Sequence, residues 1–167
     1  MKAQEIIDFR QYLLEKDLEN LENRRAFHET FEWLEGYWRS HNKLVDFDGF
    51  CSKYGGYFGS IAEFETLAKQ LAAEGVVGNS RDLNYQPLQD VADATNHLSQ
   101  GLGTPSERFR ATMLIVKQIR NNLFHGKKME WAVVNQYERN KRLVGLAGAI
   151  THLVLENLVA GEAQLGL

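Results

Sequence analysis

Residues 104–126 read TPSERFRATMLIVKQIRNNLFHG, and this stretch sets the expected fold. Thr104, Pro105 and Glu107 predict a helix start, because the threonine and glutamate side chains can bond free backbone N–H groups and proline suits the first helical position. Gly126 predicts the helix end, since glycine readily adopts the left-handed conformation that stops a helix. Apolar residues recur between these ends every three or four positions, as in a helix with one buried face. They are Phe109, Met113, Val116, Ile119 and Leu123.

The segments before this helix show similar spacing. Apolar runs within residues 6–21 and 27–38 predict two helices or one long bent helix, with weak boundary signals at Asn20 and Asn23. Residues 43–59 are rich in aromatic residues and glycine, which predicts a short helix and then a turn around Gly55-Gly56.

Two further helices are expected between that turn and Thr104. Residues 60–63, SIAE, form a capping box, which predicts a helix running to about Ala73 with Gly75 as its C-terminal cap. Residues 76–86 form a polar loop. An apolar stripe then covers residues 88–98 and is closed by Gly101.

After residue 126 we expect one long helix over roughly residues 130–158. Its second half is apolar on most sides, so it would be buried in the bundle or at a subunit contact. No strand alternation and no internal repeat interrupts the pattern. The sequence therefore predicts an all-α, single-domain helical bundle of five to six helices over residues 1–167.

Composition restricts the class of protein. With 167 residues, 44% of them hydrophobic and 25% charged, the chain can bury a core of its own. Cys51 is the single cysteine, which excludes an intrachain disulfide and fits a reducing compartment. No apolar stretch approaches the roughly 20 residues that span a bilayer, and the N-terminus lacks the apolar core of a signal peptide. We therefore expect a cytoplasmic protein without a membrane partner.

Charge is unevenly distributed along the chain. The net charge is −3, but residues 1–100 hold 10 Lys and Arg against 17 Asp and Glu, whereas residues 101–145 hold 9 against 3. The second segment can therefore attract phosphate while the first repels it. A solvated helix face that balances acids elsewhere in the fold explains the same asymmetry.

The basic segment also holds residues that suit metal-independent cleavage of RNA. The Arg120 guanidinium can bind phosphate oxygens in a fixed fork, and the His125 imidazole can exchange a proton near neutral pH. RNA supplies its own nucleophile, the 2′-OH. Asn121 or Asn122 would orient the histidine ring or bond phosphate. The backbone-binding cations would be Lys117, Lys127 and Lys128.

By spacing alone these residues have a simpler interpretation. A cationic histidine is favoured at a helix C-terminus by the helix dipole, and an arginine commonly pairs with an acid elsewhere in the fold. Arg120 and His125 are five residues apart, about 140° around an ideal helix, so they do not lie above one another. They would converge if the helix unwinds at Gly126, or across a two-fold axis between two copies.

The motif RNNLFH at residues 120–125 resembles the signature of the HEPN superfamily. That signature is an arginine, a polar residue, three or more further residues and then a histidine, at the end of a helix in a compact all-α domain. The resemblance implies a metal-independent endoribonuclease without a cofactor, of a toxin–antitoxin or antiphage-defence type. It implies a homodimer in which two motifs share one cleft. It assigns Arg120 and His125 as the catalytic pair, with Asn121 at the polar position beside them.

One position departs from a toxin subgroup of this family, which has tyrosine two residues after the histidine where this chain has Lys127. An antitoxin that modifies that tyrosine is therefore not expected, although an antitoxin or regulatory protein of another kind fits. Two alternatives remain open. One is a HEPN module that binds nucleotide, RNA or protein without catalysis, and the other is a helical interaction protein that docks a partner on the apolar face of residues 143–158.

Other candidate sites are weaker. His28 and Glu32, four residues apart on a helix, could share a metal ion but lack a third ligand, so a solvated pair is favoured. His41 and His97 stand alone, and His152 in an apolar helix suggests a packed core residue. Cys51 lacks the basic neighbours of a nucleophile, and residues 55–59 lack a phosphate-binding glycine pattern. One aromatic set predicts a core stripe with one partner-facing member: Phe27, Phe31, Trp33, Tyr37 and Trp38.

Overall fold

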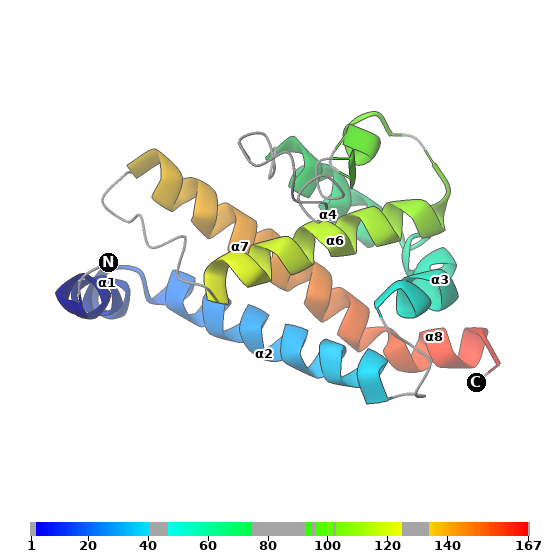
Figure 1. Cartoon of the computed structure of the whole chain (residues 1–167), viewed down its shortest axis with the longest axis horizontal. Coiled ribbons are helices and arrows are strands. Elements are labelled where there is room, and N and C mark those ends of the chain that lie inside the picture. Colours follow the sequence, from blue (N-terminus) through cyan, green and yellow to red (C-terminus); the bar gives the residue numbers. More distant parts are fainter. Residues whose placement is uncertain are drawn as a thin grey trace.

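The structure is a computed structural model that describes residues 3–40, 47–74, 93–94, 96–101, 103–124 and 134–166 (Figure 1). These residues form helices and turns with no strand, so the predicted all-α class is confirmed. Their helices outnumber the five or six expected. They are α1 (Ala3–Lys16), α2 (Leu18–Ser40), α3 (Phe47–Phe58), α4 (Ala62–Ala73), α6 (Pro105–Phe124), α7 (Val134–Glu156) and α8 (Leu158–Gln164).

Two long helices form the base of the bundle. α2 and α7 pack along each other, and α6 crosses above them while packing closely on α3 (Figure 1). The largest fully buried side chains come from α2, α3, α4, α6 and α7, and half of them are phenylalanines. They include Phe27, Phe31, Phe50, Phe58, Phe64, Phe109, Met113 and Ile150. The core therefore lies between α6 and the other four of these helices.

The start of α6 agrees with its sequence pattern. The Thr104 backbone N–H donates to Glu107 Oε2 at 2.7 Å, and the Glu107 backbone N–H donates to Thr104 Oγ1 at 3.2 Å. Pro105 is the first residue of the helix. Four of the five predicted stripe residues are at most 4% exposed, and Leu123 is half-buried. The reciprocal cap and the apolar spacing thus fix the helix that carries the candidate motif.

The predicted turn at Gly55-Gly56 is wrong, because α3 continues through both glycines to Phe58. A Cβ at Gly55 would lie 2.9 Å from Ser106 Oγ, and one at Gly59 would lie 1.9 Å from the Pro105 carbonyl oxygen. These glycines allow α3 and the start of α6 to approach each other closely. The turn itself follows at residues 59–60.

The capping box predicted at residues 60–63 is also wrong. α4 begins at Ala62 after Ile61, which offers no side-chain cap, while the Ser60 hydroxyl donates to the Gly56 carbonyl at 2.6 Å. Serine therefore satisfies the end of α3 and not the start of α4. The predicted end of this helix at Ala73 is confirmed, and the expected cap at Gly75 lies outside the described residues.

The boundary between α1 and α2 lies at Asp17, not at Asn20 or Asn23. Asp17 Oδ1 accepts a hydrogen bond from the Asn20 backbone N–H at 3.3 Å and one from Lys141 Nζ at 3.0 Å. The Tyr137 hydroxyl donates to Asp17 Oδ2, and the buried Asn20 amide donates to that hydroxyl oxygen at 3.0 Å. Asp17 therefore starts α2 and links it to α7.

We expect Asp17→Asn to lower the free energy of unfolding by about 1–3 kcal/mol at pH 7, since a partly buried carboxylate loses charged partners. Burial raises the pKa of Asp17, but the hydrogen bonds from Tyr137 and Lys141 outweigh it, and the pKa lies below its usual range. The charged form thus stabilises the fold above pH ~4 and loses that effect as pH falls through the folded-state pKa. Denaturant titrations at pH 7 and pH 3 should show the stability of the variant approaching that of wild type at pH 3.

Asp8→Asn, an exposed change on α1, is the control and should stay within about 0.5 kcal/mol of wild type at both pH values. An equal loss of stability for Asp17→Asn at both pH values contradicts the role of its charge.

The expected long C-terminal helix is divided. α7 ends at Glu156, where the Asn157 side-chain amide donates to the Leu153 carbonyl at 2.8 Å, and α8 follows. The predicted start at residue 130 lies outside the described residues. His152 is 59% exposed with its Nε2 3.0 Å from Glu156 Oε1, so the predicted core position of His152 is wrong. Its place on the solvent side of α7 explains this, because Thr151 and Leu153 on either side are buried.

Part of the predicted stripe at residues 88–98 lies outside the described residues. Ala94 and Leu98, which the structure does describe, are buried, and Gly101 has a φ of +64°, as expected for a glycine that closes a helix. Among the described helices, none by itself has the length and apolar character to cross a membrane. α7 and α8 meet that test only as a pair, and they are bent by 48° relative to each other.

Candidate functional site

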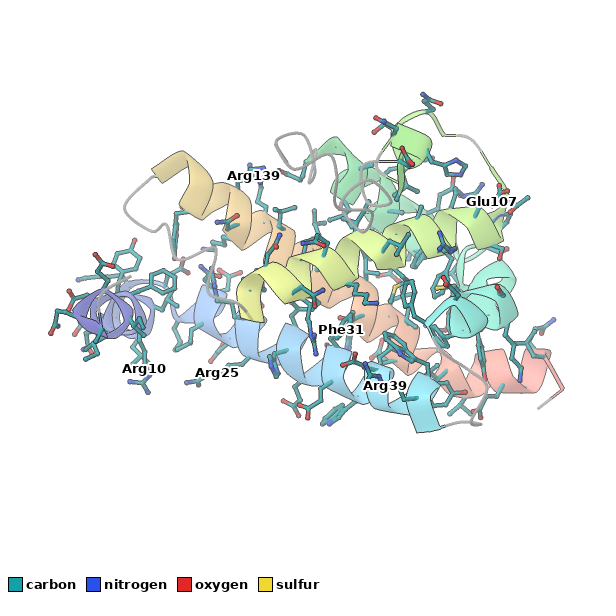
Figure 2. The ribbon with its side chains drawn as sticks, viewed as in Figure 1. Arg10, Arg25, Phe31, Arg39, Glu107 and Arg139 are labelled. Atoms are coloured by element: carbon teal, nitrogen blue, oxygen red, sulfur yellow. The ribbon has the colours of Figure 1, made fainter. Side chains whose placement is uncertain are left out.

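Arg120 lies one turn before the end of α6, where α6 passes over α2. Its Nη2 forms an ion pair with Glu35 Oε2 at 3.0 Å, and its Nη1 donates to Asn121 Oδ1 at 3.1 Å. The guanidinium carbon lies 5.2 Å from the centre of the Phe31 ring, a residue that Figure 2 shows between α2 and α6. With 29% of its side chain exposed, Arg120 is held in a defined position at the edge of the core.

Glu35 holds two arginines at once. Its Oε1 accepts from Arg39 Nη2 at 3.0 Å one helical turn further along α2. The carboxylate is 18% exposed, whereas Arg39 is 72% exposed and lies on the solvent side of this group. Because Glu35 keeps a cationic partner when either arginine is removed, its charge would not be left alone in the fold.

A small cavity opens beside Arg120. It has a volume of about 190 Å³ and is lined by Arg24, Phe27 and His28 from α2 and by Arg120 and Leu123 from α6. Most small-molecule sites are larger, roughly 300–1,000 Å³, so this space suits one chemical group of a ligand rather than a whole nucleotide. Among the described residues, its lining combines two guanidinium groups, an imidazole and two apolar side chains, with no acid.

Sequence reasoning missed Arg24 as a site residue and treated His28 only as a partner of Glu32. A usable signal was present, because Arg24 and His28 are four residues apart and so lie on the same side of the helix, beside the apolar stripe that holds Phe27. What the sequence could not show is that α6 covers this side of α2.

Three of the other predicted site residues lie on α6, and three follow its end. Asn121 contacts Arg120, and the Asn122 side-chain oxygen accepts from Gln118 Nε2 at 2.9 Å. Lys117 lies with its Nζ 4.9 Å from the centre of the Phe47 ring and does not line the cavity. His125, Lys127 and Lys128 lie outside the described residues.

Among the weaker candidates, His97 does not stand alone, because it lines a cavity of about 360 Å³ together with Asp93, Glu107 and Arg110. His28 Nδ1 and Glu32 Oε2 are 4.0 Å apart and both side chains are more than half exposed, as expected for a solvated pair. No group of three or more potential metal ligands occurs among the described residues. Burial raises the pKa of Cys51 to about 12, so it is a protonated thiol at neutral pH. His41 lies outside the described residues.

The predicted aromatic stripe is confirmed. Phe27, Phe31 and Trp38 are at most 3% exposed, Tyr37 is half-buried, and Trp33 is 56% exposed. These rings form the interior of the α2 face, so the buried members are core residues and not a surface for stacking bases.

Comparison with known proteins finds no family model, no curated protein and no solved structure that matches this chain.

Proposed function

We propose that this protein is a metal-independent endoribonuclease of the HEPN type. One observation carries the proposal: Arg120, the first residue of the RNNLFH motif, is fixed at a small basic cavity near the end of α6. A guanidinium placed at such a cavity can bind a phosphate group that enters from solvent. The motif places His125 five residues later in the chain.

The proposed reaction uses the substrate's own nucleophile. A histidine base removes the proton of the 2′-OH, the 2′ oxygen attacks phosphorus, and the 5′ oxygen leaves with a proton from a histidine acid. We assign the proton transfers to His125. Arg120 stabilises the negative charge that develops on the phosphorus oxygens. The products are a 2′,3′-cyclic phosphate and a 5′-OH.

Glu35 and Asn121 have a positioning role in this scheme. They accept hydrogen bonds from different terminal nitrogens of Arg120, which restricts rotation of the guanidinium plane. A restricted guanidinium loses less entropy when it binds the transition state. Asn122 and the basic residues Lys117, Lys127 and Lys128 are proposed to bind the RNA backbone.

We further propose that two copies form a homodimer in which the two motifs share one cleft, which supplies one histidine as base and another as acid. An antitoxin or regulatory protein that covers this cleft would fit a toxin or antiphage-defence role. A cytoplasmic location is part of the same proposal, because RNA is the substrate.

One observation favours a second candidate, a HEPN module that binds nucleotide, RNA or protein without catalysis. Glu35 already neutralises Arg120 in the structure, as in a structural ion pair. In such a module the arginine would hold α6 on α2, and the neighbouring basic residues would bind a ligand that is not cleaved.

The deciding experiment compares RNA and DNA oligonucleotides of one sequence, incubated with the protein in EDTA. We expect cleavage of RNA alone, because DNA lacks the 2′-OH, with 2′,3′-cyclic phosphate ends identified by mass spectrometry. Cleavage of both, or RNA products with 5′-phosphate ends, contradicts the mechanism. Salt-sensitive RNA binding without turnover supports the non-catalytic module.

A further inference from the structure

Arg24 on α2 faces the same cavity as Arg120 but has a different set of partners. Its Nε donates to Asn20 Oδ1 at 3.2 Å, and its guanidinium carbon lies 5.3 Å from the centre of the Phe9 ring. Both partners are neutral. Within the part of the chain that the structure describes, no ion pair joins Arg24 to a carboxylate, in contrast to the pair between Arg120 and Glu35.

Arg24 is half-buried, so its positive charge is partly removed from water without a paired carboxylate among the described residues. Burial lowers the pKa of the Arg24 guanidinium, and the negative charge of Asp17 offsets only part of this effect. Arginine nevertheless stays protonated at neutral pH because its ordinary pKa exceeds 12. An anion that enters the cavity would offset the desolvation of this charge. The bond to Asn20 uses one of five N–H donors, and the two terminal nitrogens carry the others.

The composition and size of the cavity indicate which anion fits. Arg24, His28 and Arg120 supply donors from two helices, while Glu35 contacts Arg120 without lining the cavity. At about 30 Å³ per water molecule, 190 Å³ corresponds to roughly six waters, which is room for one tetrahedral oxyanion and a few waters. Arginine forks match the oxygens of phosphate.

We propose that this cavity binds one phosphate group of the RNA strand adjacent to the scissile linkage, with Arg24 as its principal cation and His28 as a further hydrogen-bonding group. This inference rests on the proposed function, since it names a substrate subsite beside the same motif. Arg24 is a binding residue here and takes no part in proton transfer.

A matched pair of variants tests the subsite. Arg25 is the next residue on α2 and is exposed, and Figure 2 shows it directed away from α6. The probe is a mixed-sequence RNA oligonucleotide with 2′-O-methyl groups throughout, which cannot undergo 2′-OH attack. We expect Arg24→Gln to weaken its binding about tenfold or more and to reduce the slope of log affinity against log salt by about 0.7. Arg25→Gln should change the affinity less than twofold.

Because Arg24 also contacts Phe9, a second variant is needed to separate an effect on RNA binding from an effect on folding. Arg24→Lys keeps the charge but lacks the fork, and we expect it to retain the salt slope while losing part of the affinity. Thermal unfolding of each variant shows whether the bundle is intact. Equal affinities for Arg24→Gln and Arg25→Gln in folded proteins overturn the subsite.

A separate measurement distinguishes failure of this inference from failure of the nuclease proposal. Inorganic phosphate is titrated into the ¹⁵N-labelled wild-type protein while the side-chain Nε–H signals of Arg24 and Arg25 are followed by NMR. Saturable shifts of Arg24 alone support the subsite even if RNA is not cleaved. RNA cleavage with no selective shift of Arg24, and with wild-type affinity in Arg24→Gln, retains the nuclease and removes the subsite.

Discussion

Arg120→Ala is expected to lower the rate of RNA cleavage by about 10²–10³-fold, equivalent to about 3–4 kcal/mol of lost transition-state stabilisation. The side chain that is removed is held by Glu35 and Asn121 at the cavity. The loss should appear in kcat rather than in KM, because the guanidinium acts on charge that develops in the transition state. Single-turnover cleavage in EDTA with saturating protein measures it directly.

Arg39→Ala provides the matched control, because Arg39 bonds the other oxygen of the same Glu35 carboxylate and does not line the cavity. We expect its cleavage rate to stay within about twofold of wild type. Each variant leaves Glu35 with one arginine, so both should fold, and an unfolding curve for each verifies this. If Arg39→Ala and Arg120→Ala lose the same activity, the effect arises from Glu35 and α2 and not from a catalytic guanidinium.

Arg120→Lys separates charge from shape. Lysine supplies a point charge without the planar fork that bonds Glu35 and Asn121 and is proposed to bind phosphate. We therefore expect most of the rate to be lost despite the conserved charge. A variant with wild-type kcat contradicts the bidentate role assigned to Arg120.

The helices of this protein could be predicted from the sequence because apolar spacing reports burial directly. In α6 the stripe from Phe109 to Ile119 is buried as expected, and the Thr104–Glu107 cap forms with both of its hydrogen bonds. Both signals are local, since they depend on residues within one or two helical turns. Tertiary contacts did not override them here.

Two glycines of α3 and the serine that follows this helix were misassigned because a sequence pattern does not show which groups they will contact. Gly55 and Gly56 suggested a turn, yet α3 continues through both, and a Cβ at Gly55 would lie 2.9 Å from Ser106 Oγ at the start of α6. Ser60 matched a capping box but bonds the carbonyl of Gly56 behind it. A sequence pattern cannot show whether a serine hydroxyl will accept from an N–H group of the next helix or donate to a carbonyl of the preceding one.

The site was predictable only in part for the same reason. The motif on α6 identified Arg120, but its acid partner Glu35 is 85 residues earlier in the chain. Arg24 and His28 become site residues only because α6 crosses α2 beside them. Their relation to the motif is a property of helix packing, which one sequence without its fold does not determine.

The packing of α6 on the bundle depends on Phe109. We expect Phe109→Ala to lower the free energy of unfolding by about 3–5 kcal/mol. The ring is fully buried, and its centre lies 5.3 Å from Phe58, 5.3 Å from Phe64 and 5.9 Å from Phe50. It therefore joins α6 to both α3 and α4. Alanine would leave a cavity between three helices whose backbones are already in close contact, so the space cannot collapse fully.

For a domain of this size each kcal/mol corresponds to about 2–4 °C, so the melting temperature of Phe109→Ala should fall by roughly 6–20 °C. Trp33→Ala removes a larger aromatic side chain that is 56% exposed, and it should change stability by about 0.5 kcal/mol or less. Comparison of these two variants tests whether burial of the side chain, and not the size of its ring, determines the loss of stability. A loss below about 1 kcal/mol for Phe109→Ala would mean that α6 is held on the bundle mainly by its polar contacts, and the fixed position of Arg120 would then depend on Glu35 rather than on the core beneath it.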